Sequence, residues 1–591
     1  MGDWTLTGDR RASPSSTCHT GNVKPPFPAL PLLLVAAALV VLGGGVALAR
    51  WFDPAPSTQP VALASATSTP QPSSSGTAGT PLPATSGSAT SESAAEATPT
   101  PTPSPTPTPP PDLAGGVSAP WGDVEGLTMF RGNPTRTWYG TGPIPDELEV
   151  QWRFPDEPMC GNSPVGGEDK IWCGTGWTGQ PLAWERPDGI TEVIFGAYDK
   201  AIHFVDAATG ERTRPDFDMG DIIKGTVTLD PDGYPLLYAG SRDDEWRIIA
   251  LDREEPTELW SLAASAVPGM WNNDWDSNPV VVDDIVYVGG ENSWWFAIQL
   301  NRATGDDGLV TVSPDIVFDM PAFTDDLVAA VGRQQSVENS TAIFEDRAYF
   351  ANSAGRVVGV DIAGLPESAE VVLDFWMGDD VDATIVVDEV GDIYVAAEID
   401  LATGRGQEVG QFVKLDPDRP DDPVVWSIDV PPSGGLEGGI WATPALRGDL
   451  LYVPINTGEL WAVDRNTGEV VWSDDDVGGY ARSSPVLVGN RLVLAIGCLT
   501  EPALRIYDVT DPTNPQQVSD NVFTGGCIES TPAAWDGQLF VGSRDGFVYA
   551  VGPASGDGPT AAADDGAEPT APGDGEPGPT ATEDGGQATD S

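Results

Sequence analysis

Charged and aromatic residues that could bind a ligand stand just before short apolar stretches that recur along residues 118–552. Carboxylates dominate this group, and the candidate ligand-binding residues are Lys224, Asp276, Glu338, Asn339, Asp382, Trp441, Arg482 and Glu529. Calcium requires several oxygen ligands from carboxylates and amides, and the acidic members that could supply them are Asp274, Asp276, Asp380 and Asp382. The alternative, which the strongly acidic composition favours, is that these side chains are solvated and pair among themselves.

The elements that would position these residues are clearest in one stretch, Gly439–Trp472. Within it, Ala442–Leu446 and Leu450–Pro454 are predicted as two strands joined by a polar turn. Leu460–Asp464 alternates apolar and polar residues, which predicts a third strand, and Val470–Trp472 follows a turn as the fourth. Four short antiparallel strands with glycine and tryptophan at fixed places are typical of one blade of a β-propeller.

Weaker copies of this unit fill the rest of residues 118–552. Their inner strands are expected to begin near Ser163, Gly225, Ser277, Asn339, Asp382, Ala442, Ser483 and Ser530. The last copy ends at Val551 without a fourth strand, whereas an unmatched strand, 148–154, precedes the first copy. We therefore predict an all-β fold, an eight-bladed propeller of four-stranded antiparallel blades, closed by strand 148–154. A count of seven blades is the alternative.

Four of the five cysteines follow the apolar segment near the N-terminus, which favours disulfides in an oxidising compartment. In a propeller, first strands begin and second strands end on one face. Cys160 is expected to enter the first blade and Cys173 to end its second strand, while Cys498 and Cys527 take matching places in the last two blades. We predict the pairs Cys160–Cys173 and Cys498–Cys527, with a swapped pairing as the alternative. A redox dithiol is disfavoured because there is no Cys-x-x-Cys.

The ends of the chain differ from this region in composition. Residues 29–49 form an uncharged apolar run long enough to span a bilayer, and the basic residues before it place residues 1–28 in the cytoplasm as a disordered leader. Residues 50–117 are rich in Ser, Thr and Pro and are expected to form a disordered stalk. Residues 553–591 are predicted as an acidic disordered tail. The sequence thus predicts a single-pass protein of the cell membrane with an extracytoplasmic propeller; cleavage after Ala49 is the alternative.

Charge and histidine content exclude several functions. The chain carries 89 acidic and 29 basic residues, a net charge of -60, which argues against a nucleic-acid partner. Its two histidines, His19 and His203, are too few for a His-rich metal site, and only His203 follows the apolar segment. We expect His203 to be packed within a strand.

The loop Asp230–Gly233 resembles the start of a calcium loop but lacks its later ligands, so a hairpin turn is predicted.

Three motifs carry a family resemblance. Ser-x-Pro-Val at the start of repeats, AVDRNTGEVVW at 462–472 and GSRDGFVYA at 542–550 resemble the PQQ-like repeat propellers, and MFRGNP at 129–134 is similar to the start of many exported members. The resemblance covers essentially all of residues 118–552. It implies the propeller fold strongly and a function weakly, because propellers include enzymes, scaffolds and receptors.

The resemblance also implies what an enzymatic member would need. Quinoprotein dehydrogenases hold the cofactor PQQ against a tryptophan, cover it with a disulfide between adjacent cysteines and bind calcium through Glu, Asn and Asp. This sequence has no adjacent cysteines, so no catalytic residue is assigned, PQQ is not expected, and the question of enzymatic activity is open but leans to none.

The function expected from the resemblance is a binding or scaffold module in the cell envelope, similar to the lipoprotein scaffold of outer-membrane assembly machinery, with a protein or cell-envelope ligand as its partner. The first alternative is a calcium-dependent PQQ oxidoreductase. The second is a carbohydrate- or cell-wall-binding head. Trp441, at the start of an inner strand, is the residue most expected to face a ligand.

Overall fold

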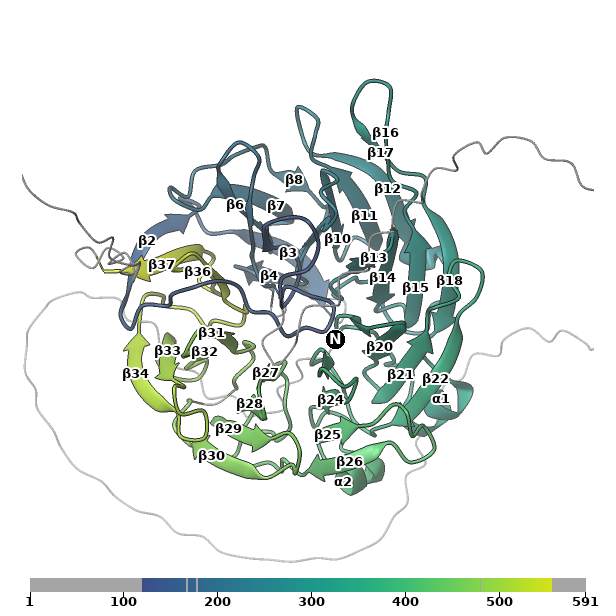
Figure 1. Ribbon diagram of the computed structural model, residues 1–591, viewed down its shortest axis with the longest axis vertical. Coiled ribbons are helices and arrows are strands. Elements are labelled where there is room, and N and C mark those ends of the chain that lie inside the picture. Colours follow the sequence, from purple (N-terminus) through teal and green to yellow (C-terminus); the bar gives the residue numbers. More distant parts are fainter. Residues whose placement is uncertain (1–118, 166–167, 177–178, 479, 555–591) are drawn as a thin grey trace, which may run out of the picture. The chain divides into compact units, whose positions relative to one another are not determined.

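The computed structural model describes residues 119–165, 168–176, 179–478 and 480–554. All of them belong to one compact unit, and their regular structure is almost entirely β-strand, in eight sheets around a common centre (Figure 1). The all-β fold and the count of eight blades are therefore confirmed. The predicted leader, membrane segment, stalk and acidic tail lie outside the described residues. No described helix has the length and apolar character needed to cross a membrane.

The first four blades are formed by consecutive stretches of chain, and in each of them the strands follow one another from the channel outward. Blade one contains β5 (Leu182–Glu185), β6 (Thr191–Gly196), β7 (Ala201–Asp206) and β8 (Phe217–Asp218). Blade two contains β9 (Thr228–Leu229), β10 (Leu236–Gly240), β11 (Glu245–Ala250) and β12 (Thr257–Ala263). Blade three contains β13 (Val280–Val282), β14 (Ile285–Gly290), β15 (Trp294–Gln299) and β18 (Asp315–Pro321). Blade four contains β19 (Ala342–Phe344), β20 (Arg347–Ala351), β21 (Arg356–Asp361) and β22 (Glu370–Trp376).

The other four blades complete the ring. Blade five contains β23 (Val386–Val387), β24 (Ile393–Ala396), β25 (Phe412–Leu415) and β26 (Val424–Ile428). Blade six contains β27 (Ala445–Arg447), β28 (Leu450–Ile455), β29 (Glu459–Asp464) and β30 (Val470–Asp474). Blade seven contains β31 (Val486–Val488), β32 (Arg491–Ile496), β33 (Ala503–Asp508) and β34 (Gln516–Asn521). Blade eight contains β35 (Ala533–Trp535), β36 (Gln538–Gly542), β37 (Val548–Pro553) and β2 (Leu148–Phe154).

The composition of blade eight confirms the predicted closure. Strand β2 runs antiparallel to β37, with Val150 opposite Val551 and Phe154 opposite Val548. An early segment of the chain therefore supplies the outer strand of the last blade, and the ring closes through main-chain hydrogen bonds.

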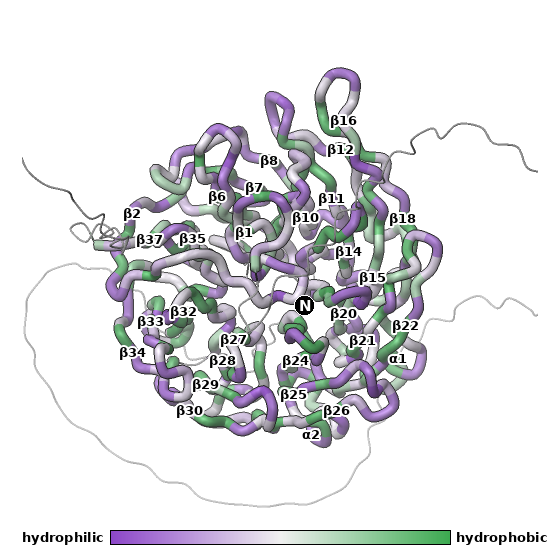
Figure 2. Tube along the Cα trace, in the orientation of Figure 1, coloured by the Kyte–Doolittle hydropathy of each residue, from purple (hydrophilic) through white to green (hydrophobic). Residues whose placement is uncertain are grey.

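Smaller elements stand outside the four-stranded pattern. Strand β1 (Gly126–Leu127) pairs with β5 on the inner side of blade one. A short hairpin of β16 (Ala303–Thr304) and β17 (Val310–Thr311) extends blade three, and the helices α1 (Asp325–Val331) and α2 (Gly404–Val409) lie at the edge of the ring (Figure 1). Hydrophobic residues follow the strands, and polar residues are frequent in the loops (Figure 2).

Outer-strand tryptophans join neighbouring blades through the Thr-Gly turns of the repeat. The indole of Trp426 in β26 donates to the carbonyl of Arg465 in blade six at 2.8 Å. Gly468, with a φ of 74°, lies against that ring, and a Cβ there would meet indole carbons at 2.9 Å. Trp152 in β2 makes the same contact with blade one, where it donates to Ala207 at 2.7 Å. The repeated tryptophan and glycine therefore form an inter-blade contact.

One predicted inner strand is wrong. The stretch near Ser163 lies in a separate two-stranded hairpin, β3 (Cys160–Val165) and β4 (Glu168–Cys173), and not in blade one. Its local sequence matches the start of a blade, but an inner strand is covered on both faces, whereas Ile171 is 74% exposed. Leu182 and Ala183 in β5 are fully buried and take the inner position.

The segment 121–141 fills the channel and bonds to the innermost part of every blade. These contacts pair Glu125 with Glu185, Thr128 with Leu229, Trp121 with Val281, Pro134 with Ile343, Thr135 with Val387, Arg131 with Pro444 and Pro485, and Thr141 with Ala534. Inner strands have no further strand on their channel side, so this segment satisfies main-chain groups that would otherwise be unpaired. We call residues 121–141 the channel segment.

Two arginines anchor the channel segment. The fully buried guanidinium of Arg131 donates to the carbonyls of Thr443, Pro444 and Pro485 at 3.2, 2.7 and 2.6 Å. Arg136 donates to the carbonyl of Thr341 at 2.5 and 3.0 Å. Burial lowers the pKa of Arg131 to about 10 and that of Arg136 to about 9, so both remain charged at neutral pH.

Replacing Arg131 with alanine should destabilise the whole ring. Three buried carbonyls would lose their donor, and an unsatisfied buried polar group costs roughly 1–3 kcal/mol. We expect Arg131→Ala to lower the free energy of unfolding by about 3 kcal/mol or more in urea titrations followed by tryptophan fluorescence. The control is Arg447→Ala, which removes a solvent-exposed bond to the Gly489 carbonyl and should cost about 0.5 kcal/mol or less. Equal effects of the two substitutions would contradict the anchoring role.

Candidate functional site

Most predicted site residues meet at one face of the ring. Because blade strands alternate in direction, the loops before first strands and after second strands lie on the same side, and we call this side the entrance face. It carries Lys224 and Arg242 of blade two, Asp274, Asp276 and Glu291 of blade three, Glu338 of blade four, Asp380, Asp382 and Glu398 of blade five, Trp441 of blade six, Arg482 of blade seven, and Glu529 and Arg544 of blade eight. The channel segment closes the channel behind this face.

A buried ion cluster occupies the entrance face between blades two and three. The ammonium of Lys224 lies 2.6 Å from Asp276, 3.1 Å from Glu291 and 3.4 Å from Asp274, and Arg242 lies 2.5 Å from Asp274. Burial, with the charge of Glu291, raises the pKa of Asp274 and raises that of Asp276 to about 6. Burial opposes the charge of Lys224, but the three carboxylates outweigh it and raise its pKa.

The carboxylates of this cluster have the spacing of metal ligands. One oxygen each of Asp274, Asp276 and Glu291 lies within 4.8 Å of the others. However, Lys224 and Arg242 already place two positive charges among them. A cation at this position would have to displace the lysine ammonium, so the donor set fits an internal ion cluster better than a calcium site.

A second group of carboxylates lies on blade five. Asp380 and Asp382 precede β23, and Glu398 follows β24, where its main-chain N–H donates to the Asp380 carbonyl at 2.8 Å. Burial raises the pKa of all three groups, and the neighbouring carboxylates raise those of Asp380 and Glu398 further.

Aromatic and cationic side chains lie on the other side of the entrance face. The guanidinium of Arg482 lies 4.1 Å from the ring centre of Trp441 and forms a 2.9 Å ion pair with Glu529. Arg544 lies 3.7 Å from Glu529 and 4.6 Å from the ring centre of Tyr198. Trp441 is therefore half-buried, with Arg482 over one face of its ring. These contacts fix an aromatic and cationic surface next to the carboxylates of blade five, since Glu398 forms a bridge with Gly439, two residues before Trp441.

The other predicted candidates make internal contacts. Asn339 is fully buried, donates to the carbonyls of Ala351 and Val381 at 2.9 and 2.8 Å, and accepts from the Ala351 N–H, so it joins blades four and five. Glu338 accepts from the hydroxyl of Ser336 at 2.8 Å. Asn339 is thus placed to hold the blades together, whereas Glu338 is held by Ser336, whose hydroxyl also lies 2.7 Å from that of Ser353.

Sequence reasoning missed the residues contributed by the ends of second strands. Arg242 follows β10, Glu291 follows β14, Glu398 follows β24 and Arg544 follows β36. Because second strands end on the entrance face, a charged residue directly after a second strand is the sequence signal for all four.

The predicted disulfides are confirmed, and both lie on the entrance face. Cys160 bonds Cys173 across the β3–β4 hairpin, with 4.1 Å between their Cα atoms, and Cys498 bonds Cys527 with 4.5 Å. The cysteines of the first pair do not enter blade one as predicted, since they join the ends of the separate hairpin. Trp172 of this hairpin packs edge-on against Tyr198, with 5.6 Å between ring centres.

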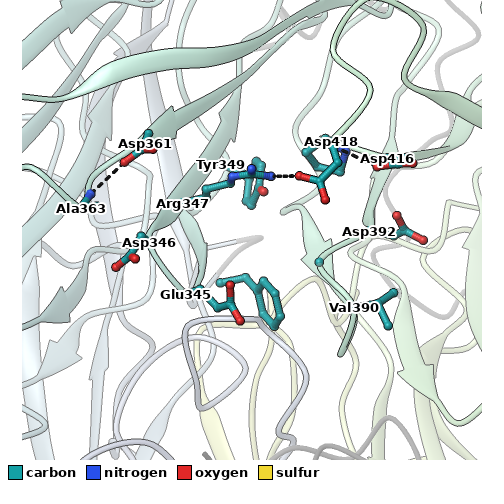
Figure 3. Close-up of a pocket in the computed structure, with 13 residues that line it drawn as sticks. Glu345, Asp346, Arg347, Tyr349, Asp361, Ala363, Val390, Asp392, Asp416 and Asp418 are labelled. Atoms are coloured by element: carbon teal, nitrogen blue, oxygen red, sulfur yellow. Dashed lines mark hydrogen bonds and ion pairs between the residues drawn. The ribbon is translucent and has the colours of Figure 1, made fainter.

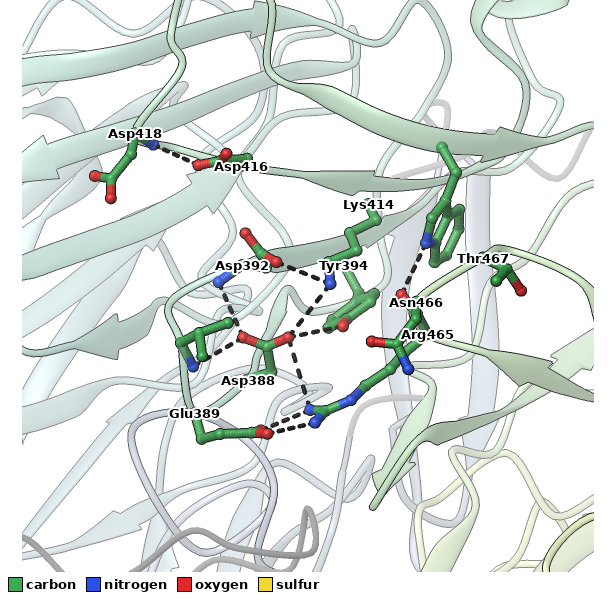
Figure 4. A network of polar contacts seen from close by, with 12 residues as sticks. Asp388, Glu389, Asp392, Tyr394, Lys414, Asp416, Asp418, Arg465, Asn466 and Thr467 are labelled. Atoms are coloured by element: carbon green, nitrogen blue, oxygen red, sulfur yellow. Dashed lines mark hydrogen bonds and ion pairs between the residues drawn. The ribbon is translucent and has the colours of Figure 1, made fainter.

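The opposite face carries a repeated polar contact. Asp230 accepts from the N–H of Asp232 at 3.0 Å, from the hydroxyl of Tyr238 at 2.6 Å and from Arg302 of blade three at 2.7 Å. The predicted hairpin turn is therefore confirmed. Figure 4 shows the equivalent arrangement at Asp388, which accepts from Tyr394 at 2.8 Å and lies 3.7 Å from Arg465 of blade six.

An acidic pocket of about 310 Å³ lies beside this contact, between blades four and five (Figure 3). The charged residues of its lining are Glu345, Asp346, Asp361, Asp392, Asp416, Asp418 and Arg347. Arg347 pairs with Asp418 at 2.7 Å. The predicted ligand-binding residues lie elsewhere, on the entrance face.

His203 lies in β7, away from the entrance-face cluster. Its two ring nitrogens lie 3.1 Å from Asp199 and 3.1 Å from Asp216, and Arg212 pairs with Asp216. Burial opposes the charge of His203, but the hydrogen bonds to Asp199 and Asp216 outweigh it and raise the pKa. The expectation that His203 is packed within a strand is confirmed.

The fold and its motifs define the class of protein. Eight four-stranded blades, built from the repeats seen in the sequence, make the chain an eight-bladed β-propeller, and its last blades are similar to the PQQ-like repeats. Residues 408–558 match the family model described as outer membrane protein assembly factor BamB. No curated protein matches the chain.

Three solved structures are similar to parts of this chain. The computationally designed protein Ika8 has a TM-score of 0.42 at 13% identity, over 61% of this chain and 93% of that chain. BamB from Moraxella catarrhalis has a TM-score of 0.34 at 12% identity, over 68% and 97%. Quinohemoprotein alcohol dehydrogenase from Comamonas testosteroni has a TM-score of 0.47 at 12% identity, over 72% and 80%. Scores this low support no functional argument.

Removing Lys224 should leave three carboxylates buried together without their main counter-charge. Breaking a buried ion pair by removing one partner costs roughly 3–5 kcal/mol, and we expect Lys224→Met to lower the free energy of unfolding in urea by about that amount. Lys200→Met is the control, because Lys200 forms a single, partly exposed pair with Asp221 at 3.3 Å, and such pairs contribute about 1 kcal/mol or less. A small effect at Lys224 would show that the cluster does not depend on it.

His203 should make stability depend on pH near neutrality. Since its pKa is raised in the folded state, its contribution is fully present below the unfolded value of about 6.5 and is lost as the pH rises through the folded value. The stability difference between wild type and His203→Gln should therefore shrink from about pH 6 to 9 in urea titrations. Phe195→Leu, which leaves both carboxylates in place, should run parallel to wild type. A difference that stays constant for His203→Gln would contradict this assignment.

Proposed function

We propose that the chain is a binding or scaffold module of the cell envelope, without catalysis of its own, and that it presents the entrance face to a protein or other envelope ligand. The observation that carries this proposal is the arrangement of that face. The channel segment closes it from behind, and its charged residues are held by ion pairs and ring contacts, as at Lys224 and Arg482. Such a surface is preorganised for binding.

The ionisable groups also favour binding over general acid–base chemistry. Among the described residues the one histidine is His203, which is 1% exposed, and both of its ring nitrogens pair with carboxylates. The described cysteines form disulfides. Among the described residues, therefore, no histidine is exposed as a proton carrier and no free cysteine is present as a nucleophile for a ligand at this face.

The family match supports the envelope part of the proposal. The matched family model is described as an outer membrane assembly factor, and a role in assembly implies contact with other proteins. An extracytoplasmic propeller anchored by residues 29–49 and separated from the bilayer by the stalk 50–117 would place the entrance face within reach of such partners. Both disulfides agree with an oxidising compartment.

A calcium-dependent PQQ oxidoreductase is the alternative from a different class. PQQ requires a flat slot between two broad, largely apolar surfaces, with calcium at its edge. In this chain Arg482 covers one face of Trp441, Trp275 is buried against Phe296, and the disulfides join cysteines 13 and 29 residues apart. The residues present do not form the slot, and we derive no reaction through this cofactor.

A carbohydrate-binding head remains the second alternative, favoured by Trp271, whose side chain is 41% exposed.

The proposal is tested by comparing two arginine variants of the full-length chain. Arg482→Ala removes the cation from the entrance face, and Arg347→Ala removes one from the opposite face. After cross-linking in intact membranes and quantitative mass spectrometry, Arg482→Ala should lower the recovery of the main envelope partner about tenfold, since interfaces depend on a few arginine and aromatic residues. Arg347→Ala should leave recovery unchanged.

Two results would refute the proposed function. Equal partner recovery with both variants would show that the entrance face is not the binding surface. Turnover of alcohols or sugars by the purified chain with added PQQ, calcium and an electron-accepting dye would establish the oxidoreductase instead. Retention on a glycan column without a protein partner would favour the carbohydrate-binding head.

A further inference from the structure

We propose that strand β4 of the β3–β4 hairpin is a docking edge on the entrance face, to which an extended segment of a protein partner adds as a third strand. This inference rests on the proposed function, because it names the way in which the partner is held. The partner segment binds through its main chain and has an apolar side chain beside Ile171 and a basic side chain beside Asp169.

The hairpin stands outside the eight blades, and Figure 1 shows it beside blades one and eight. In the described part of the chain, its main chain is bonded to the blades at its base alone. The N–H of Met159 donates to Gly546 of blade eight at 2.9 Å, and the N–H of Tyr198 of blade one donates to Gly174 at 2.8 Å. A disulfide joins the first and last residues of the hairpin. Because a two-stranded sheet is marginally stable by itself in water, a third strand would complete it.

The register of the hairpin shows which main-chain groups of β4 are free. The Cα atoms of Cys160 and Cys173 are 4.1 Å apart, which is the short spacing of a pair without mutual hydrogen bonds. Such pairs alternate with hydrogen-bonded ones, so Ile171 and Asp169, two and four residues before Cys173, also turn their N–H and carbonyl groups away from β3. Asp169 faces Pro164, which has no N–H, in agreement with this pattern. No described residue bonds to these groups of Asp169 and Ile171.

The outer edges of blades two to eight are protected against strand addition, whereas β4 is not. In each of these blades the pair formed by the third and fourth strands contains a break in register, as between Ala462 and Val463. Such β-bulges turn an edge away from further pairing. The strands of the hairpin pair without a break. On the β3 side Pro164 removes a donor from the edge, so β4 is the side on which a strand can add.

The two faces of the hairpin have different surroundings. Trp172 points toward the ring, where it packs edge-on against Tyr198, and its ring centre lies 5.6 Å from the guanidinium of Arg544. Successive side chains of a strand point to opposite faces, and Ile171 is accordingly 74% exposed. A strand added to β4 covers this apolar side chain and pairs the free main-chain groups in one step. Strand addition uses main-chain bonds for affinity and side-chain contacts for specificity.

Charge indicates the kind of segment that fits this edge. The chain has a net charge of -60, and Asp169 is an exposed residue of β4. Like charges on neighbouring strands destabilise their pairing, and a high net charge keeps copies of one protein apart. An acidic segment and a second copy of this chain are therefore disfavoured. A segment with an apolar and a basic residue two positions apart matches both Ile171 and Asp169, which lie on one face of β4.

The test measures amide hydrogen exchange of the purified full-length chain, with its disulfides intact, in the presence of a synthetic peptide. This probe repeats Val-Thr-Lys-Thr, which puts valine and lysine on one face of a strand and threonine on the other. Exchange of the Ile171 N–H should slow about tenfold when the probe is in about tenfold excess over its Kd. The Trp172 N–H, which is already bonded to β3, should change little. A probe of the same sequence, N-methylated at every residue, keeps the charge and should give no protection.

Two variants at one position separate the strand edge from the side chain. Ile171→Pro removes the free N–H and leaves the bonds between β3 and β4 in place, so the Kd of the probe should rise about tenfold or more. Ile171→Thr is the matched control, since it keeps the N–H and a β-branched side chain, and it should raise the Kd about fourfold or less. Equal melting temperatures of both variants and the wild type establish that neither disturbs the ring.

The proposal is overturned if Ile171 gains no protection at millimolar probe, if the N-methylated probe protects it equally, or if Ile171→Pro and Ile171→Thr bind alike. Sedimentation that shows a dimer of the wild type, lost with Ile171→Pro, would assign the edge to a second copy of the chain and overturn it too. These measurements need no native partner, whereas the proposed function is tested by partner recovery with Arg482→Ala. A failure of one is therefore distinguishable from a failure of the other.

Discussion

The propeller depends on how the main chain is satisfied at the centre of the ring. Each inner strand has a partner on one side only, so its channel side presents N–H and carbonyl groups in a place where water is restricted. The channel segment supplies the missing partners, and the guanidinium of Arg131 alone donates to carbonyls of both blade six and blade seven. The entrance face has a solid floor for this reason, and its side chains can be held in fixed positions above it.

Around this centre the blades are joined by contacts that repeat along the chain. The outer tryptophan of one blade donates to the Thr-Gly turn of the next, as Trp426 does to Arg465. On the face opposite the entrance, an aspartate accepts from a tyrosine of its own blade and meets an arginine of the following blade, as at Asp230 and Arg302. The repeat motif therefore encodes the interfaces between blades as well as the blades.

Much of this architecture could be predicted from the sequence because it rests on local patterns. Copies of the unit at Gly439–Trp472 predict seven of the eight inner-strand starts correctly, and the missing fourth strand after Val551 points to 148–154 as its replacement. The error at Ser163 arose because a blade start is recognised by a few residues, whereas burial on both faces, which Leu182 has and Ile171 lacks, depends on distant parts of the chain. The contacts of Arg131 with residues more than 300 positions away leave no local signal. The sequence analysis names the residues of the entrance face that precede first strands, such as Asp382. It does not name those that follow second strands, such as Glu398.

The position of the closing strand has a consequence for the order in which the molecule can form. Both the channel segment and β2 are synthesised before any complete blade, yet β2 finds its partner β37 only at the end of the domain. A chain that stops early has six or seven intact blades but neither a closed ring nor a full set of partners for residues 121–154. Completion of the fold is in this way coupled to completion of synthesis, and an interrupted chain is left with exposed strand edges by which quality-control proteases and chaperones can distinguish it.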